Sequence, residues 1–190
     1  LIYFGLSDVE DKLERMTRFI QQSMFEAYSR LSGNIFDALF GMQELVIPPG
    51  QSFDWESVKL MLGRLGKNNN LSEREIEQAL AVSSSSTEGY RPMMYFLQQL
   101  STSYEDSRPY ETAIEEFVSV VNGYFEVALT DKRLRFDKMT LKVDVVNLVT
   151  EKTLPLGSLS SGEKQIVSVF SRLILDGDKK YFVLIDEPEL

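Results

Sequence analysis

Apolar residues recur at three- and four-residue spacing through the first two-thirds of the chain, a pattern typical of amphipathic helices. The longest run extends from about residue 7 to residue 33, and the same spacing continues over residues 34–41 despite Gly33. Pro92 and Pro109 each suit the first turn of a helix, so each is expected to begin one. The shorter predicted helices cover residues 54–66, 72–82, 92–102 and 109–125. The sequence thus predicts a helical block.

From Lys132 onward the apolar residues alternate with polar ones, which predicts β-structure. Residues 132–145 are expected to form a hairpin or meander, and residues 153–156 an extended arm leading into a helix. The apolar residues of that helix are Ile166, Val169, Phe170 and Leu173. Residues 181–185 form an unbroken apolar run, as expected of a strand buried on both faces of a largely parallel sheet. The predicted class is α/β, with a helical lobe over residues 1–130 and a second part over residues 131–190.

Composition narrows the chemistry that the chain can perform. Hydrophobic residues make up 43% of the 190 residues, which is enough for a core. The net charge of −9 argues against a broad nucleic-acid surface and leaves only a local basic patch as a route to DNA. Cysteine and histidine are absent, which excludes disulfides, thiolate nucleophiles and histidine bases. No apolar run approaches the roughly 20 residues of a membrane span, so we expect no membrane partner and a cytoplasmic location.

The residues Ser160-Ser161-Gly162-Glu163 are expected at the N-terminus of a helix. Unpaired backbone N–H groups, two hydroxyls and a glycine without a Cβ are well suited to bind a phosphate there. The plainer interpretation is a capping box between Ser160 and Glu163, which stabilises many helices. Both interpretations can hold together, because a capped helix end can still face a phosphate.

Two carboxylates, Asp186 and Glu187, directly follow the apolar run over residues 181–185. Ligands of open α/β sheets gather beyond the carboxyl ends of strands, so this pair is well placed for a metal ion and a nucleotide. By itself such a pair is also compatible with exposed carboxylates at the end of a strand. The two segments together, separated by one helix and a polar turn, are a far more specific pattern than either alone.

The sequences LSSGEKQ and YFVLIDEPEL resemble the signature motif and Walker B strand of ABC-type ATPases. They look most like the chromosome-maintenance (SMC), RecF-like and OLD-like branch, which includes many prokaryotic defence ATPases. The resemblance implies a P-loop NTPase fold in which residues 131–190 form part of the ATPase core. It also implies that Asp186 holds Mg²⁺ through water and that Glu187 orients or deprotonates the attacking water. Ser160, Ser161, Gly162 and Glu163 would contact the γ-phosphate of ATP bound to a second subunit.

The sequence contains no Walker A motif. Residues 63–68, GRLGKN, include a Gly-Lys pair, but the first glycine is two positions too close and asparagine replaces Ser/Thr. We therefore expect the chain to be a fragment whose Walker A segment lies elsewhere. The cofactors implied are ATP and Mg²⁺, and the partners are further copies joined through ATP, with an effector protein or DNA left open. The alternative is an ATPase-fold scaffold that holds an effector and hydrolyses little ATP.

Overall fold

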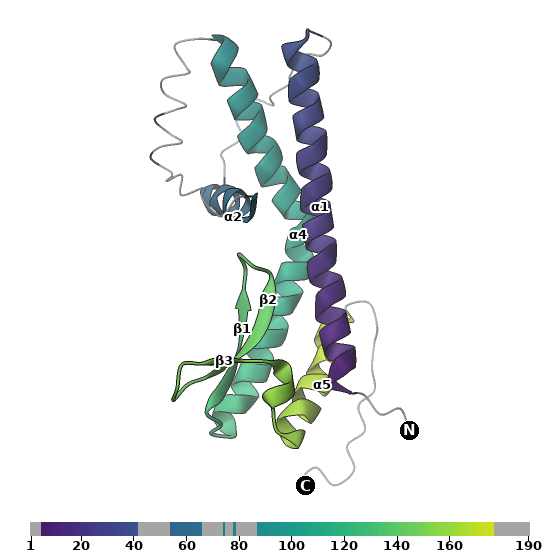
Figure 1. Ribbon diagram of the computed structural model, residues 1–190, viewed down its shortest axis with the longest axis vertical. Helices are drawn as coiled ribbons and strands as arrows, with labels where there is room; N and C mark the ends of the chain where they lie inside the picture. Colours follow the sequence, from purple (N-terminus) through teal and green to yellow (C-terminus); the bar gives the residue numbers. More distant parts are fainter. Residues whose placement is uncertain (1–4, 42–53, 66–73, 75–77, 79–86, 177–190) are drawn as a thin grey trace. The chain divides into compact units, whose positions relative to one another are not determined.

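The computed structural model describes residues 5–41, 54–65, 74, 78 and 87–176. It shows a mixed α/β chain with N-terminal helices, then a small three-stranded antiparallel sheet and a C-terminal helix (Figure 1). The helices are α1 (Leu6–Leu39), α2 (Trp55–Leu65), α4 (Thr87–Val127) and α5 (Ser161–Leu175), with a short 3₁₀ helix η1 (Leu156–Ser158). The strands are β1 (Lys132–Asp137), β2 (Lys142–Asn147) and β3 (Thr153–Leu154). Several predicted features lie outside the described residues. They are most of the helix over residues 72–82, the strand over residues 181–185, and the two carboxylates Asp186 and Glu187.

The contacts divide the chain into two compact units that interleave in sequence. One unit comprises residues 1–15, 111–136 and 142–190, and the other comprises residues 16–110 and 137–141. Helices α1 and α4 each contribute residues to both units. The division of the chain into a helical lobe (residues 1–130) and a second part (residues 131–190) stays a prediction. No described helix is long and apolar enough to cross a membrane.

The prediction of a long first helix is confirmed by α1, and α2 confirms the predicted helix over residues 54–66. The predicted apolar stripe of α1 supplies the buried residues Val9, Leu13, Ile20, Met24 and Leu31. In the unit formed by residues 16–110 and 137–141, Phe19 packs on Tyr110 with ring centroids 4.4 Å apart. The amide of Asn34 donates a hydrogen bond to the Tyr95 hydroxyl at 2.8 Å.

The prediction that Pro92 and Pro109 begin separate helices is wrong, because both lie inside the single helix α4. An interior proline removes a backbone hydrogen bond and costs a helix about 3 kcal/mol. Burial along one face of α4 offsets this cost, since its buried residues continue at three- and four-residue spacing past Pro109, which itself is exposed. These residues are Leu97, Leu100, Tyr104, Ser107, Glu111, Ile114, Phe117, Val121 and Phe125.

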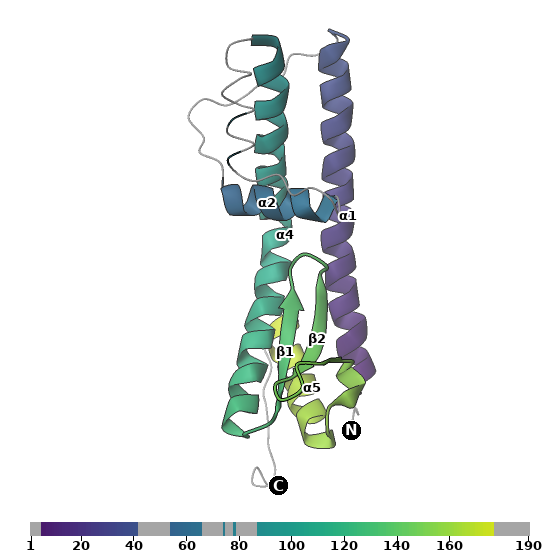
Figure 2. The ribbon, with the colours of Figure 1, turned by 60° about the vertical axis from the view of Figure 1, so that its left-hand side comes forward.

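The predicted hairpin is confirmed and extends into a sheet with strand order β1-β2-β3. Val145 pairs with Leu154, and Val146 with Thr153. In both ribbon views β1 and β2 lie along the C-terminal half of α4 (Figures 1 and 2). The side-chain amide of Asn122 on α4 holds β1 directly: its Oδ1 accepts from Leu134 N at 2.8 Å, and its Nδ2 donates to Leu134 O at 2.9 Å.

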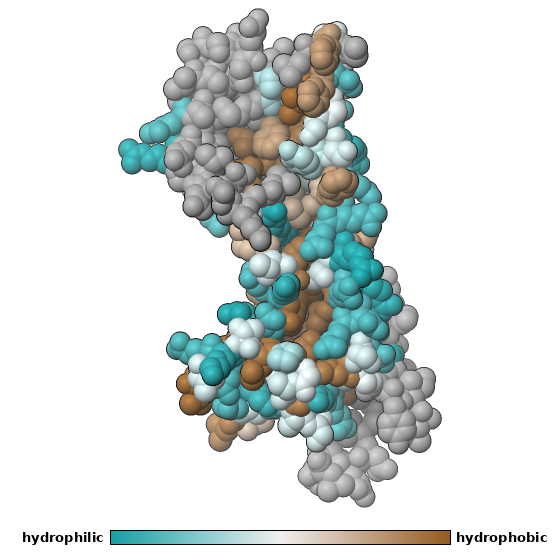
Figure 3. Space-filling model, viewed as in Figure 1, coloured by the Kyte–Doolittle hydropathy of each residue, from teal (hydrophilic) through white to brown (hydrophobic). Residues whose placement is uncertain are grey.

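The end of α4 turns the chain into β1. Leu129 has a left-handed backbone (φ 52°), its N–H donates to Glu126 O, and the Thr130 N–H donates to Phe125 O. This pair of bonds is a Schellman motif, in which the left-handed position usually carries glycine. Leu129 is 90% exposed and Val149, in the turn between β2 and β3, is 78% exposed. Apolar surface is visible over this end of the unit at the lower left of Figure 3.

Candidate phosphate-binding site at the start of α5

Helix α5 begins with the predicted capping box. Ser160 is the N-cap in extended conformation, and its hydroxyl oxygen accepts from the Glu163 N–H at 3.3 Å. In return the Ser160 N–H donates to Glu163 Oε2 at 2.6 Å. Two buried leucines, Leu156 and Leu159, anchor the chain just before the helix. We call Leu159–Gln165 the signature segment.

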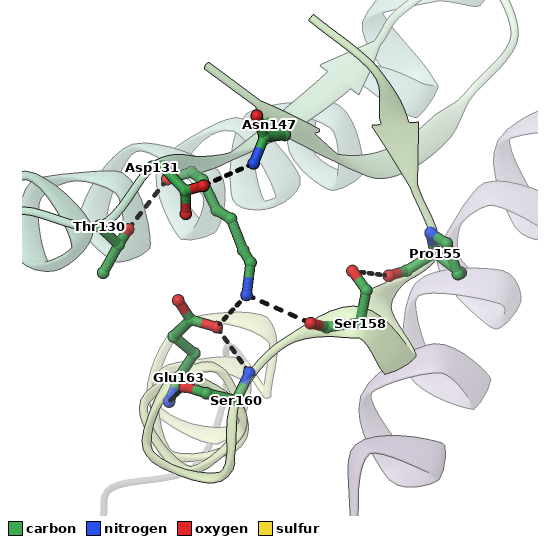
Figure 4. A network of polar contacts seen from close by, with 8 residues as sticks. Thr130, Asp131, Asn147, Pro155, Ser158, Ser160 and Glu163 are labelled. Atoms are coloured by element: carbon green, nitrogen blue, oxygen red, sulfur yellow. Dashed lines mark hydrogen bonds and ion pairs between the residues drawn. The ribbon is translucent and has the colours of Figure 1, made fainter. Parts of the chain in front are cut away.

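A lysine that sequence reasoning missed completes this turn. The Lys132 ammonium donates to Glu163 Oε2 at 3.0 Å and to Ser158 O at 3.2 Å (Figure 4). The ion pair is largely sheltered, since 18% of the Lys132 side chain and 11% of the Glu163 side chain are exposed. Burial works to raise the pKa of Glu163, but the Ser160 N–H and Lys132 outweigh it, and the pKa is lowered from its usual 4.5. Glu163 is therefore a carboxylate turned inward at neutral pH.

The outer side of the same turn is open. Ser160, Ser161 and Gly162 are all exposed, and a Cβ built on Gly162 would meet no atom within 4 Å. Within the described part of the chain, the backbone N–H groups of Ser161 and Gly162 have no acceptor. Two free amides and two exposed serines thus lie on the first turn of α5, at the positive end of the helix dipole. This arrangement suits an anion such as a phosphate.

The buried positions of α5 differ from the apolar residues whose spacing predicted the helix. Phe170 packs on Tyr124 with ring centroids 4.7 Å apart, but Val169 and Leu173 are exposed. The buried positions are Val167, Ser168, Ser171 and Leu175. The prediction followed the helical spacing of the apolar residues, whereas two of the four buried positions are serines. The Ser171 hydroxyl needs no outside partner because it donates to Ser168 O at 2.9 Å.

A second lysine holds the other end of α5. The Lys12 ammonium donates to Ser171 O at 3.2 Å and pairs with Asp176. A cation at these last carbonyls complements the negative end of the helix dipole. Around it lies a polar cavity of about 270 Å³, lined by Asp8, Asp11, Lys12, Arg15, Ser171, Arg172 and Asp176. Helix α5 is thus secured at each end by a lysine from a distant segment.

The structure does not bring together every residue of the predicted site. It places Ser160, Ser161, Gly162 and Glu163 on one turn, whereas Asp186 and Glu187 lie outside the described residues. No group of three or more acidic residues in the described ranges could hold a metal ion. The metal and catalytic roles of Asp186 and Glu187 therefore stay predictions.

Lys132 and Lys12 carried no signal that could identify them from the sequence. Lys132 is 31 residues from Glu163 and Lys12 is 164 residues from Asp176, and isolated lysines at such separations form no motif. Only the folded chain shows that both act on α5. No protein-family model matches the sequence, and no curated protein matches it, so the local geometry and the two short motifs carry the functional argument.

Proposed function

We propose that this chain belongs to an ABC-type ATPase of the SMC, RecF-like and OLD-like branch, with a P-loop NTPase fold. Its signature segment would bind the γ-phosphate of ATP held by a second copy. The observation that carries the proposal is the open first turn of α5, where the amides of Ser161 and Gly162 have no acceptor among the described residues. Capping alone would leave no reason for a glycine at the second helical position, since glycine destabilises a helix relative to alanine.

The residues present fit a phosphate. A Cβ on Gly162 would project into open space, and the neighbouring residues Ser160 and Ser161, which carry hydroxyls, are exposed. Because the paired Glu163 carboxylate is turned toward Lys132, the outward face of the turn presents donors. Fixed donors of this kind favour developing negative charge in phosphoryl transfer. A phosphate that reaches them only when two copies pair makes ATP a switch for association as well as a substrate.

ATP hydrolysis would depend on Asp186 and Glu187, the two carboxylates that follow the apolar run over residues 181–185. Asp186 has the residue type and sequence position to hold Mg²⁺, which neutralises phosphate charge when bound. Glu187 would orient or deprotonate water. The proposal requires a Walker A segment from outside this sequence. The attached activity that hydrolysis gates would belong to anti-phage defence or DNA maintenance, as the resemblance suggests.

The test uses the full-length protein and separates pairing from hydrolysis. Ser161→Arg should abolish ATP-dependent association and leave nucleotide binding intact, because the arginine fills the exposed first turn. Ser119→Arg is the matched control, since Ser119 is exposed on α4. Association that survives Ser161→Arg would refute the role of the signature segment.

Glu187→Gln should bind ATP and remain associated but lose most turnover. Steady-state hydrolysis unchanged by this substitution would refute the assignment of Glu187. If the unmodified protein associates with ATP but does not hydrolyse it, the scaffold alternative is supported instead.

A further inference from the structure

We infer that Lys132 is a positioning residue that makes the signature segment competent for phosphate by neutralising and turning away the Glu163 carboxylate. This inference rests on the proposed function. Glu163 is the residue next to Gly162, so its carboxylate belongs to the same helical turn as the free amides. An unpaired carboxylate in that turn would oppose an approaching phosphate, because like charges repel strongly where water is partly excluded.

The contacts of Lys132 show how the carboxylate is restrained. Its ammonium bonds Glu163 Oε2 and Ser158 O, and Glu163 Oε2 also accepts from the Ser160 N–H. The Lys132 ammonium therefore links the Ser158 carbonyl, just before the signature segment, to the Glu163 carboxylate within it. With the carboxylate held on the inner side, the outer side of the turn is left to the amides of Ser161 and Gly162.

Hydrogen bonds hold the backbone around Lys132, so its side chain extends toward Glu163 from a fixed position. The Thr130 hydroxyl donates to Lys132 O at 3.2 Å, and the Leu148 N–H donates to Asp131 O at 2.6 Å. The Asn147 amide donates to the Asp131 carboxylate at 2.6 Å. Figure 4 shows the Thr130 and Asn147 bonds on the strand side and the Glu163 bonds on the helix side of the same network. The sheet thus determines where the charge that restrains Glu163 lies, which is the preorganisation that a binding site requires.

This role predicts opposite effects when the ion pair is broken from its two sides. Lys132→Met leaves a partly buried, unpaired carboxylate beside the phosphate site. Glu163→Gln leaves an ammonium there, while glutamine can still serve in a capping box. A purely structural ion pair predicts instead that both substitutions weaken the turn to a similar extent.

The experiment measures the ATP-dependent association constant of the full-length protein for each variant, together with ATP binding and thermal stability. We expect Lys132→Met to weaken association about tenfold, equivalent to about 1.4 kcal/mol. Glu163→Gln should strengthen association about threefold, because attraction replaces a neutral pair. Lys132→Arg should restore most of the association, and the double variant Lys132→Met/Glu163→Gln should associate better than Lys132→Met alone. Lys142→Met is the control, since Lys142 is an exposed lysine at the start of β2.

Each outcome decides one question. Weaker association in Lys132→Met with stronger association in Glu163→Gln supports the inference. Equal losses in both variants, or no loss in Lys132→Met, overturn it while leaving the proposed function intact. If the unmodified protein shows no ATP-dependent association, the proposed function fails and the inference fails with it.

Discussion

Replacing Gly162 with alanine separates two roles of the first turn of α5, helix formation and access to backbone amides. A Cβ at this position meets no atom within 4 Å, so the substitution introduces no clash. Alanine is favoured over glycine inside a helix by about 1 kcal/mol, and about half of that is expected near a helix end. Gly162→Ala should therefore raise the free energy of unfolding by about 0.5 kcal/mol.

The same methyl group should weaken phosphate binding. It adds bulk to the exposed turn that carries the two free amides, and losing one hydrogen bond to a charged group costs about 1.5–3 kcal/mol. ATP-dependent association should thus fall about 10- to 100-fold. Stability is measured by urea unfolding and association by sedimentation with and without ATP, both on the full-length protein.

Gly157→Ala provides the matched control. Gly157 lies in η1, and a Cβ there also meets no atom within 4 Å. This substitution should likewise leave stability equal or slightly higher, but association should not change, because Gly157 precedes the signature segment. A loss of stability in Gly162→Ala, or undiminished association, would refute the view that this glycine is kept for access to the amides.

Three further predictions concern the groups that position the site. Acidification should destabilise the start of α5: the folded pKa of Glu163 is lowered, so its contribution is present above the usual 4.5 and is lost as the pH falls through the folded value. Urea unfolding between pH 6 and pH 3 should therefore show a steeper loss in the unmodified protein than in Glu163→Gln, and equal slopes would contradict the assignment. Asn122→Ala should lower the free energy of unfolding by about 2–3 kcal/mol, because the N–H and C=O of the buried Leu134 lose their bonds to Asn122. Hydrogen exchange at the Leu134 amide should become faster in this variant, and unchanged protection of that amide would contradict the prediction. Pro109→Ala should raise the free energy of unfolding by about 2 kcal/mol, since Pro109 is exposed within α4. Pro155→Ala should lower it slightly, because φ at Pro155 is −69°, a value that proline favours. Calorimetry that finds Pro155→Ala more stable than Pro109→Ala would refute this account.

The parts of the fold that sequence analysis predicted are those with a local cause. The apolar stripe of α1 and the alternation of apolar and polar residues that begins at Lys132 both depend on residues close in sequence. The helix α1 and the strand β1 form as expected. The capping box joins Ser160 and Glu163, which are three residues apart, so its bonds also follow from local spacing. Where an element depends on near neighbours alone, the sequence contains the necessary information.

Errors arose where tertiary packing decided the result. Pro109 is a local signal for a helix start, but burial on both sides of it keeps α4 continuous. On α5 the helical spacing included Val169 and Leu173, but both are exposed, and Ser168 and Ser171 are buried together with Val167 and Leu175. Lys132 was missed because only the sheet brings it to Glu163. These outcomes depend on elements distant in sequence, which local patterns do not encode.

The Asn122 amide has a consequence for how β1 resists unwanted pairing. β1 is an edge strand of the described sheet, and edge strands expose N–H and C=O groups to which a strand from another molecule can add. At Leu134 both groups are already bonded to Asn122, much as a neighbouring strand would bond them. A single side chain on α4 thus blocks the middle of this edge, and its loss would expose β1 to aggregation through strand addition.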